Sequence, residues 1–286
     1  MADFQNTLVY AEEWTEKLQE ELDEPNKWED ICNVEYTNVR VLHNPYLTDM
    51  TVQTGVRGCS YTPQAITETD DSITISTFRI APQFIDRADM AQMTFFKQMD
   101  IARRQAVLLK EAIETSVYGT HSSFTDFTNT AIGGGAGSIT VSATNIDNII
   151  TGVAREIREA NGQALYDRNG GFFVWTPADL EILQGFAMAN GFNTADQTLK
   201  NGVPSNGFNY MGFTHYSSNL LPLGRVVAGV KKSIHLGILK DTYGQIVIDD
   251  KDPAQVSGIS IVSRADYAVK VWNKMAAVVF DVAVVS

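Results

Sequence analysis

Histidine is the side chain best suited to bind a metal or move a proton near neutral pH. The chain has four histidines, which are His43, His121, His215 and His235. None lies in an HExxH, HxH or Cys-x-x-Cys pattern, and no G-x-S-x-G pattern marks a nucleophilic serine. His215 lies in a strand-like stretch, which favours a structural role. We therefore expect no catalytic residue, no metal and no cofactor.

Two other segments could suggest ligand binding, and each has a simpler interpretation. The stretch IDDKDP, residues 248–253, lacks EF-hand spacing and its final glutamate, so we expect a solvated turn. GGGAG, residues 133–137, lacks the ending and the context of a phosphate-binding loop. It belongs to residues 121–138, which we expect to form a flexible connector. Cys32 and Cys59 have no metal spacing and are expected to be free thiols, as in a reducing cytoplasm.

The bulk composition is typical of a soluble globular protein with an acidic surface. Of the 286 residues, 44% are hydrophobic and 20% are charged, and the formal net charge is −12 with a pI of about 4.7. This charge argues against a protein that grips nucleic acid, because neutralising phosphates requires clustered Lys and Arg. The N-terminal stretch MADFQNTLVYAEEW does not resemble a signal peptide. The longest apolar run, MAAVVFDVAVV, is too short for a membrane span and contains Asp281.

Hydrophobic periodicity predicts one long helix over residues 88–118. Apolar residues recur every three or four positions, at Ala88, Ala91, Phe95, Met99, Ala102, Ala106, Leu109, Ile113 and Val117. Asp86 or Asp89 suits its N-cap, and Gly119 suits the residue just beyond its end. At ~1.5 Å per residue, this helix would be a long rod. A second amphipathic helix, over residues 4–22, is either a surface helix of the same domain or an arm that reaches a neighbour.

Residues 50–82 are predicted to form a long two-stranded hairpin ahead of that helix. Strand-like segments flank the polar stretch TETDDS, residues 67–72, which is expected to be the turn. The large apolar residues are few; they are Val52, Val56, Tyr61, Ile66, Ile73, Ile75 and Phe78. An isolated hairpin is marginally stable in water, and its edges carry unpaired backbone groups. We therefore expect the hairpin to project from the body and to lie on a neighbouring copy of the chain.

The remaining sequence predicts a second region of mixed structure. Residues 145–162 have the pattern of an amphipathic helix, and residues 170–185 predict a buried strand followed by a helix with Thr176 as N-cap. The last segment predicts two strands about a turn near Asn273. In the second strand one face is expected to carry Val278, Phe280, Val282 and Val284. This order of elements predicts an α+β fold with mixed sheets.

Several of these stretches, in this order, resemble the major capsid proteins of tailed bacteriophages, the Hong Kong 97-like family. TETDDSITISTFRIAPQFIDRADMAQ is similar to the end of the family's extended loop entering its spine helix, and the helix 88–118 is similar to that spine. FFVWTPADLEILQG resembles the start of the axial domain. GFNYMGFTHYSSNLLP resembles a Gly-aromatic segment that ends in Ser-Asn-x-Leu-Pro. VVAGVKKSIHLG and YAVKVWNKMAAVVF are similar to the closing strands.

The resemblance implies a division of the chain. The implied parts are an N-terminal arm at 1–45, an extended β-hairpin loop at 46–82, a spine helix and peripheral domain at 83–139 completed by 246–286, and an axial α/β domain at 140–245. The polar loop 187–207 would form the tip of the axial domain, which faces the five- and six-fold axes.

The function that the resemblance implies is structural and not enzymatic. The chain would self-assemble, as hexamers and pentamers, into the icosahedral head shell of a tailed phage. It would enclose double-stranded DNA through weak, non-specific contact. Assembly would take place in the host bacterial cytoplasm, the mature location would be the virion, and a portal but no membrane would be a partner. Two alternatives stand beside this one: an encapsulin-type compartment that encloses cargo protein, and an enzyme with scattered catalytic residues.

Two departures from the family pattern set further expectations. Some members crosslink neighbours through a lysine of the extended loop, but no Lys occurs here between Lys27 and Lys97. Shell strength would then come from noncovalent contacts or a decoration protein. The short arm favours a separate scaffolding protein over a precursor trimmed before residue 1.

Contacts between subunits are expected at a small set of side chains in and near the hairpin. They are Arg57, Tyr61, Phe78, Arg79 and Arg87. The three arginines would pair with carboxylates of adjacent copies. The alternative is that they form exposed pairs within the chain, which contribute little to stability.

Overall fold

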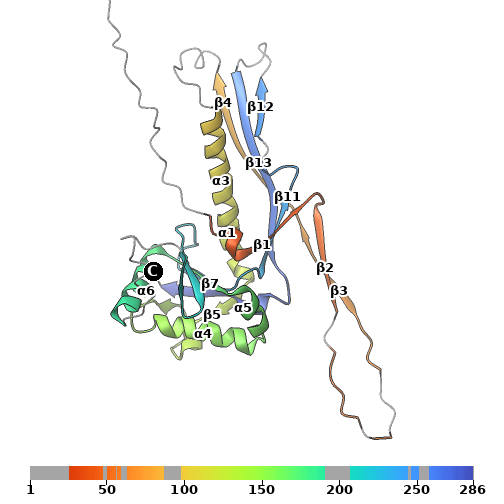
Figure 1. Ribbon diagram of the computed structural model, residues 1–286, viewed down its shortest axis with the longest axis vertical. Coiled ribbons are helices and arrows are strands. Elements are labelled where there is room, and N and C mark those ends of the chain that lie inside the picture. The colour runs from red at the N-terminus through yellow and green to blue at the C-terminus, as the bar shows by residue number, and fades with distance from the viewer. Residues whose placement is uncertain are drawn as a thin grey trace, which may run out of the picture.

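The computed structural model describes residues 26–47, 50–55, 57–58, 63–86, 98–190, 207–243, 246–250 and 258–285. These residues form a rounded lobe, an elongated body, and a thin ribbon that leaves the junction between them (Figure 1). Helices and mixed sheets occur in both the lobe and the body, which confirms the predicted α+β fold.

The rounded lobe is built on a sheet with seven strands among the described residues. The strand order is β5-β14-β10-β7-β9-β8, and β6 also pairs with β14. The strands are β5 (Thr125–Phe127), β6 (Ile139–Thr140), β7 (Gly171–Trp175), β8 (Phe208–Tyr210), β9 (Phe213–Ser217), β10 (Arg225–Val230) and β14 (Val279–Val285). The helices of this lobe are α4 (Ile146–Glu159), α5 (Gln163–Asn169) and α6 (Pro177–Ala189).

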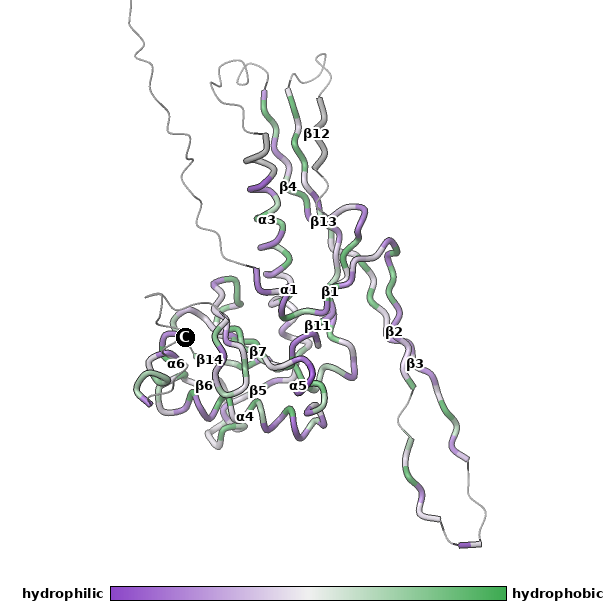
Figure 2. The backbone as a smooth tube through the Cα atoms, viewed as in Figure 1, coloured by the Kyte–Doolittle hydropathy of each residue, from purple (hydrophilic) through white to green (hydrophobic). Residues whose placement is uncertain are grey.

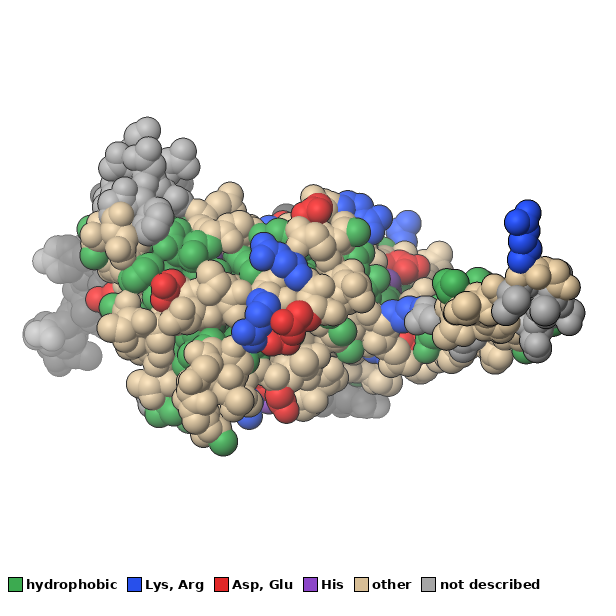
Figure 3. All heavy atoms as spheres, turned by 90° about the horizontal axis from the view of Figure 1, so that it is seen from below, with side chains coloured by type: hydrophobic (Ala, Val, Ile, Leu, Met, Phe, Trp, Pro, Cys, Tyr) green, Lys and Arg blue, Asp and Glu red, His purple; other side chains and the backbone are tan. Residues whose placement is uncertain are grey.

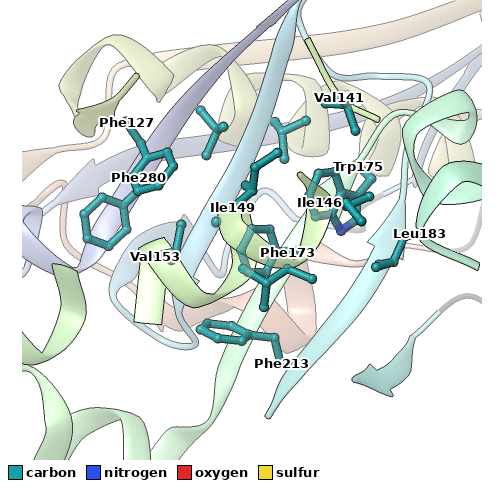
Figure 4. Packing of buried hydrophobic residues seen from close by; sticks show 14 of the residues in the cluster. Phe127, Val141, Ile146, Ile149, Val153, Phe173, Trp175, Leu183, Phe213 and Phe280 are labelled. Atoms are coloured by element: carbon teal, nitrogen blue, oxygen red, sulfur yellow. The ribbon is translucent and has the colours of Figure 1, made fainter. Parts of the chain in front are cut away.

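One face of this sheet packs against α4 to form the core of the lobe. Figure 4 shows side chains of α4, such as Ile149 and Val153, meeting side chains of the strands. The four residues of the predicted face are buried in this core: Phe280, Val282 and Val284 lie in β14, and Val278 ends the 3₁₀ turn just before it. The predicted cap of α6 is also present, because the Asp179 N–H donates to Thr176 Oγ1 over 3.2 Å. Local sequence signals therefore placed these elements correctly.

The elongated body combines the long helix with a second sheet. Helix α3 (Gln98–Gly119) lies along a five-stranded sheet of described strands with the order β1-β11-β13-β12, in which β4 also pairs with β13. The strands are β1 (Cys32–Thr37), β4 (Thr77–Asp86), β11 (Ile234–Leu239), β12 (Ile246–Asp250) and β13 (Gly258–Val271). The Gln105 side chain donates to Ile261 O over 3.0 Å and accepts from Ser263 Oγ over 2.8 Å. These bonds hold α3 over β13.

The end of α3 differs from the prediction. Gly119 has φ −63° and ψ −18°, so it is right-handed helical and is not a left-handed residue beyond the helix. The chain continues into a 3₁₀ turn, Thr120–Ser123, and Thr120 Oγ1 donates to Val117 O over 2.7 Å. The Thr120 hydroxyl thus donates to a carbonyl of the last helical turn. In a helix that ends with a left-handed glycine, backbone N–H groups beyond the helix would bond such carbonyls instead. Residues 87–97, with the predicted start of this helix, lie outside the described part of the chain.

Residues 121–138 have defined structure, so the prediction of a flexible connector is wrong. The segment contains β5, which pairs in parallel with β14, and a 3₁₀ turn at Asn129–Ile132. Phe124 and Phe127 are buried, each in a different core, and they anchor it. Phe127 approaches α4 so closely that a Cβ on Gly152 would lie 2.8 Å from its ring. The prediction was wrong because the segment is rich in polar residues, and the burial of Phe124 and Phe127 could not be inferred from its composition.

Two strands belong to sheets other than those that the predicted domain boundaries imply. β11 lies within the range 140–245 expected for the axial domain, but it pairs with β1 and β13 of the body. β14 lies within 246–286, expected to complete the peripheral domain, but it pairs with β10 and β5 of the lobe. Asp249 and Asp250, expected in a solvated turn, end strand β12. The chain therefore passes between the two sheets more often than the boundaries suggest.

Candidate assembly surface

The described residues contain no cluster that resembles a metal centre. No three His, Cys, Asp or Glu side chains among them are placed to hold an ion, and none of their helices has the length and apolarity to cross a bilayer. His215 lies in β9 and is buried, as a structural residue should be. Trp175 Nε1 donates to its Nδ1 over 2.9 Å, so its Nε2 carries the hydrogen and donates to Tyr210 O over 3.1 Å. Its ring stacks on Phe173 and Phe208.

This environment predicts an acid-sensitive contribution of His215 to stability. Burial lowers the pKa of His215 from 6.5 to about 4, although the hydrogen bond to Tyr210 O acts in the opposite direction. Above pH 6.5 the ring is neutral in both states. Between pH 6.5 and about 4 only the unfolded chain binds the proton, so the free energy of unfolding should fall by about 3 kcal/mol across this window.

Urea unfolding of the free subunit at several pH values measures this dependence. In His215→Gln, which does not titrate, most of the slope should disappear. The matched control is His43→Gln, which removes an exposed histidine of the ribbon and keeps His215, so the part of the slope assigned to His215 should remain. An unchanged slope in His215→Gln would contradict the assignment.

The two-stranded ribbon is the first part of the candidate assembly surface. It pairs β2 (Val41–Leu47) with β3 (Glu68–Thr74) in antiparallel register, from Val41 opposite Thr74 to Leu47 opposite Glu68. The ribbon is shifted from the predicted hairpin. Residues 67–72, expected to be the turn, lie mostly in a strand, and residues 77–86 belong to the sheet of the body. The segment that joins the two ribbon strands is therefore 48–67.

A buried carboxylate holds the root of the ribbon. Lys270 Nζ donates to Asp71 Oδ1 over 2.5 Å and to Ser72 O over 2.6 Å, and the Asn273 N–H donates to Asp71 Oδ2 over 2.8 Å. Burial alone would raise the pKa of Asp71, but these hydrogen bonds and the Lys270 charge hold the pKa below its ordinary value. Around the root lies a small apolar cluster of Leu42, Ile73, Ile75, Leu239, Ala268 and Trp272. The root thus rests on its own chain.

The outer part of the ribbon, comprising the described residues 50–55, 57–58 and 63–67, is exposed throughout. Val52 is 100% exposed, and Met50 and Ile66 are also exposed. Across the ribbon, Gln64 Nε2 donates to Thr51 O over 3.0 Å, and Gln64 Oε1 accepts from the Thr51 N–H over 3.1 Å. The Gln64 side chain thus bonds both backbone groups of Thr51, in place of a pair of backbone–backbone hydrogen bonds between the strands. The ribbon is a slender projection beside the body (Figure 3), with apolar and polar segments interleaved (Figure 2).

The second part of the candidate surface is the face of the body sheet that α3 does not cover. In β13, Ala265 and Tyr267 are buried toward α3, so the alternate residues of the strand face away from the helix. The β4 residues paired with those alternate positions include Phe78, Ile80 and Phe84, which are 51%, 48% and 45% exposed. Contiguous apolar side chains on a surface indicate a binding site for another molecule. We name this surface, with the alternate residues of β13, the open face.

The predicted contact residues are distributed as follows. Phe78 lies on the open face, next to two apolar residues that the sequence analysis did not single out. Arg79 is exposed on β4, on the side of the sheet that faces α3. Arg57 is exposed in the turn of the outer ribbon. Tyr61 and Arg87 lie outside the described residues. The alternation of Phe78 and Ile80 in a strand was the signal from which the open face could have been found.

A buried ion pair joins the start of the described chain to the long helix. Lys27 and Glu114 have side chains 3% exposed, and Lys27 Nζ lies 3.8 Å from Glu114 Oε1. The Lys27 N–H donates to Glu114 Oε2 over 3.2 Å, and Tyr118 OH donates to Oε1 over 2.8 Å. Ser218 Oγ, from the loop after β9, donates to the same oxygen over 3.4 Å. The sequence analysis did not find this cluster, which connects three parts of the fold.

The short helix α1 (Trp28–Ile31) is held between the body and the lobe next to this ion pair. Its residues Trp28 and Ile31 are buried with α3, and Lys231 Nζ donates to Asp30 Oδ2 over 2.6 Å from the end of β10. Cys32 follows, and burial raises the pKa of its thiol. Cys32 is a free cysteine, as predicted, whereas Cys59 lies outside the described residues.

Known proteins resemble this chain in structure and not in sequence. No protein-family model matches the chain, and no curated protein matches it in sequence. A protein from Mycobacterium phage Che8 matches with a TM-score of 0.72 over 96% of this chain and 97% of its own, at 17% identity. A protein from the capsid of Ralstonia phage GP4 matches with a TM-score of 0.65 over 100% of this chain and 98% of its own, at 9% identity. The chain has the fold of phage capsid proteins.

The capsid-protein fold is the one that the sequence resemblance implied. A virus-like particle from Pyrococcus furiosus matches less closely, with a TM-score of 0.53 over 90% of this chain and 92% of the other, at 8% identity. The phage proteins and the protein of this virus-like particle therefore share one fold with the chain. At these identities the comparisons establish the fold and assign no role to an individual residue.

Proposed function

We propose that this chain is the structural subunit of the icosahedral head shell of a tailed bacteriophage, which encloses double-stranded DNA. The observation that carries the proposal is a pair of uncovered surfaces, the outer ribbon and the open face, on a chain with the capsid-protein fold. Each surface exposes apolar side chains. Their burial against another copy would lower the free energy of the subunit. One contact of this kind, repeated by closed symmetry, yields a stable shell even when each contact is modest.

The proposal assigns roles to the parts and partners to the whole. The lobe would be the axial domain around the five- and six-fold axes, with the loop 187–207 at its tip, and the body would be the peripheral domain. A separate scaffolding protein, a portal and a decoration protein are the expected partners, and the virion is the expected location. A net charge of −12 supports a container that contacts its DNA weakly, since a basic interior would bind the DNA tightly.

Electron microscopy of the expressed chain tests the proposal. We expect closed shells of uniform size in negative stain, from the chain alone or from the chain expressed with its scaffolding protein. A chain that stays monomeric under both conditions would show the proposal to be wrong. An enzymatic function would predict that monomeric outcome together with a catalytic activity.

The second candidate is a compartment subunit that encloses protein, and the match to the Pyrococcus virus-like particle favours it specifically. That match has the lower TM-score, so the phage shell is the better-supported proposal. The genes beside this one discriminate between the two: a portal and a terminase accompany a phage shell, and a cargo enzyme accompanies a compartment. The contents of purified particles, DNA or protein, provide the same test biochemically.

Arg79 and Arg87 provide a prediction about the contacts between copies. Arg79 is exposed on β4 and forms no ion pair with a described residue. We expect the double variant Arg79→Ala, Arg87→Ala to lower the yield of shells severalfold, because carboxylates of adjacent copies would lose their partners. Sedimentation measures the ratio of shells to free subunits. Arg103→Ala, which removes an exposed arginine of α3, is the matched control, and an unchanged yield in the double variant would contradict the prediction.

A further inference from the structure

A buried histidine of β11, His235, lies where the root of the ribbon rests on the body. Alternate residues of β11 belong to the core beneath α3; they are Ile234, Leu236 and Ile238. The residues between them, His235 and Gly237, therefore face the other side of the sheet. At Gly237 the ribbon approaches so closely that a Cβ would lie 3.0 Å from Leu42 Cδ1. His235 is only 4% exposed and is two positions away from this contact.

The ring of His235 shares a neighbour with the root of the ribbon. Its centroid is 4.9 Å from that of Trp272, and the two ring planes are inclined by 43°. Trp272 also packs against the apolar cluster around the root, which includes Ile73 of β3. Trp272 is thus held between the histidine and the root. Displacement of the root would leave Trp272 free to move and would open the His235 ring to water.

Among the described residues, the polar and charged groups that face His235 come from three strands. From β1, Asn33 Nδ2 lies 3.3 Å from Nδ1 of the ring, and Glu35 Oε2 lies 3.4 Å from Nε2. In β13, Lys270 is opposite His235 in the antiparallel register, and Asp71 of β3 binds its ammonium group. Asn33 therefore donates to Nδ1, and Nε2 carries the hydrogen. This is the arrangement of a neutral ring, beside a lysine whose charge Asp71 offsets.

A second proton on the His235 ring does not fit this arrangement. It would be carried by Nδ1, toward which Asn33 Nδ2 donates, so two donors would face each other. Burial lowers the pKa of His235 from 6.5, and the charge of Glu35 acts in the opposite direction. The Glu35 side chain is 52% exposed, so water weakens its effect. The proton therefore favours a state in which the ring is exposed to water.

We infer that protonation of His235 loosens the root of the ribbon from the body, so that the ribbon is held firmly at neutral pH and weakly in mild acid. A ring that is neutral when covered favours the closed root above pH 6.5. This preference is lost as the pH falls below 6.5 toward the lower pKa of the covered ring. Asp71 stays charged in this window, because its pKa lies below 3.8. The inference concerns the single subunit and holds whether or not the chain builds a shell.

Hydrogen exchange of the free subunit at about pH 7 and about pH 5, corrected for the intrinsic exchange rate at each pH, tests the inference. We expect the amides of β2 and β3 to exchange severalfold faster at the lower pH in the wild type. In His235→Gln, which does not titrate, this acceleration should be absent. The matched control is His43→Gln, which removes an exposed histidine of the same ribbon and should keep the acceleration. An equal acceleration in His235→Gln, or none in the wild type, would overturn the inference.

A second variant keeps His235 and its packing. Glu35→Gln removes the opposing charge at an exposed position, so the pKa of His235 should fall further and the acceleration in mild acid should exceed that of the wild type. A smaller acceleration would contradict the inference. Peptides of β7 and β10 report the separate response of His215 in the lobe. Equal acceleration of the ribbon and lobe peptides in the wild type would indicate global unfolding and would also overturn the inference.

Discussion

Glu114→Ala is expected to lower the free energy of unfolding of the free subunit by about 3–5 kcal/mol. The substitution takes the carboxylate away from the Lys27 ammonium, and the Lys27 side chain is only 3% exposed. It also removes the acceptor for Tyr118 OH and Ser218 Oγ. Removing one member of a buried ion pair costs more than the pair contributes in net terms, because the other charge stays in a medium of low dielectric constant. Urea unfolding followed by tryptophan fluorescence measures the loss.

Two further variants separate the charge from the packing at this site. Glu114→Gln keeps an oxygen that can accept from Tyr118, so its effect should be smaller than that of Glu114→Ala. Thr115→Ala changes the next, exposed residue of α3 and should alter the free energy of unfolding by less than about 0.5 kcal/mol. If Glu114→Ala were no more destabilising than Thr115→Ala, the contribution of the buried ion pair would be refuted.

Asp71→Ala is expected to reduce shell formation by more than tenfold while most of the subunit stays folded. The carboxylate is the group through which Lys270 and the Asn273 N–H hold the root of the ribbon. Without it, both donors lose their acceptor, which should lower the free energy of unfolding by roughly 1.5–3 kcal/mol. The larger effect is on assembly, because a ribbon with a loose root must be ordered again at each contact with a neighbour. Sedimentation and negative-stain images give the yield of shells.

The control for Asp71 is its neighbour Asp70. Asp70 lies on the exposed side of the ribbon, where His43 Nδ1 is 2.6 Å from its Oδ2. Asp70→Ala should therefore change both stability and assembly far less than Asp71→Ala. Equal effects of the two substitutions would show that acidity of the ribbon, and not the anchoring of its root, determines assembly.

The lowered pKa of Asp71 also gives the sign of a pH effect. A carboxyl group whose pKa is lower in the folded state stabilises the fold above its ordinary value of 3.8, and this stabilisation is lost as the pH falls through the lower, folded value. The anchor is thus complete at neutral pH, where the assembly experiments are done. Asp71→Ala should remove this acid sensitivity.

Elements with a strong local pattern could be predicted from the sequence. The alternation of Phe280, Val282 and Val284 specified the buried face of β14, and Thr176 with Asp179 specified the start of α6. These signals act over a few residues, so no knowledge of distant contacts is needed. The resemblance to capsid proteins then supplied the order of the elements, which the fold confirms.

Elements that depend on distant partners could not be predicted in this way. The stretch TETDDS has the composition of a turn, but Asp71 bonds Lys270, 199 positions away, and the segment pairs with β2 as a strand. A polar residue in a strand is stable only if such a partner is present. Lys27 and Glu114, 87 positions apart, are a similar case, since each alone looks like a surface charge. Arg264 Nε and Asp266 Oδ1 are buried without a hydrogen-bond partner among the described residues. Their position on the face opposite α3 follows from the register of β4 with β13, which the sequence does not show.

Strand β13 connects the root of the ribbon to the sheet of the body and would transmit force between them. Lys270, near the end of β13, donates a hydrogen bond to Asp71 at the root of the ribbon. Over Gly258–Tyr267 the same strand is paired with β4. Backbone hydrogen bonds of an antiparallel pair lie perpendicular to the strands. A pull on the ribbon directed along β13 would therefore load these bonds together in shear and would not unzip them one at a time. Tension that a neighbour applies to the tip would be shared along the whole length of the sheet.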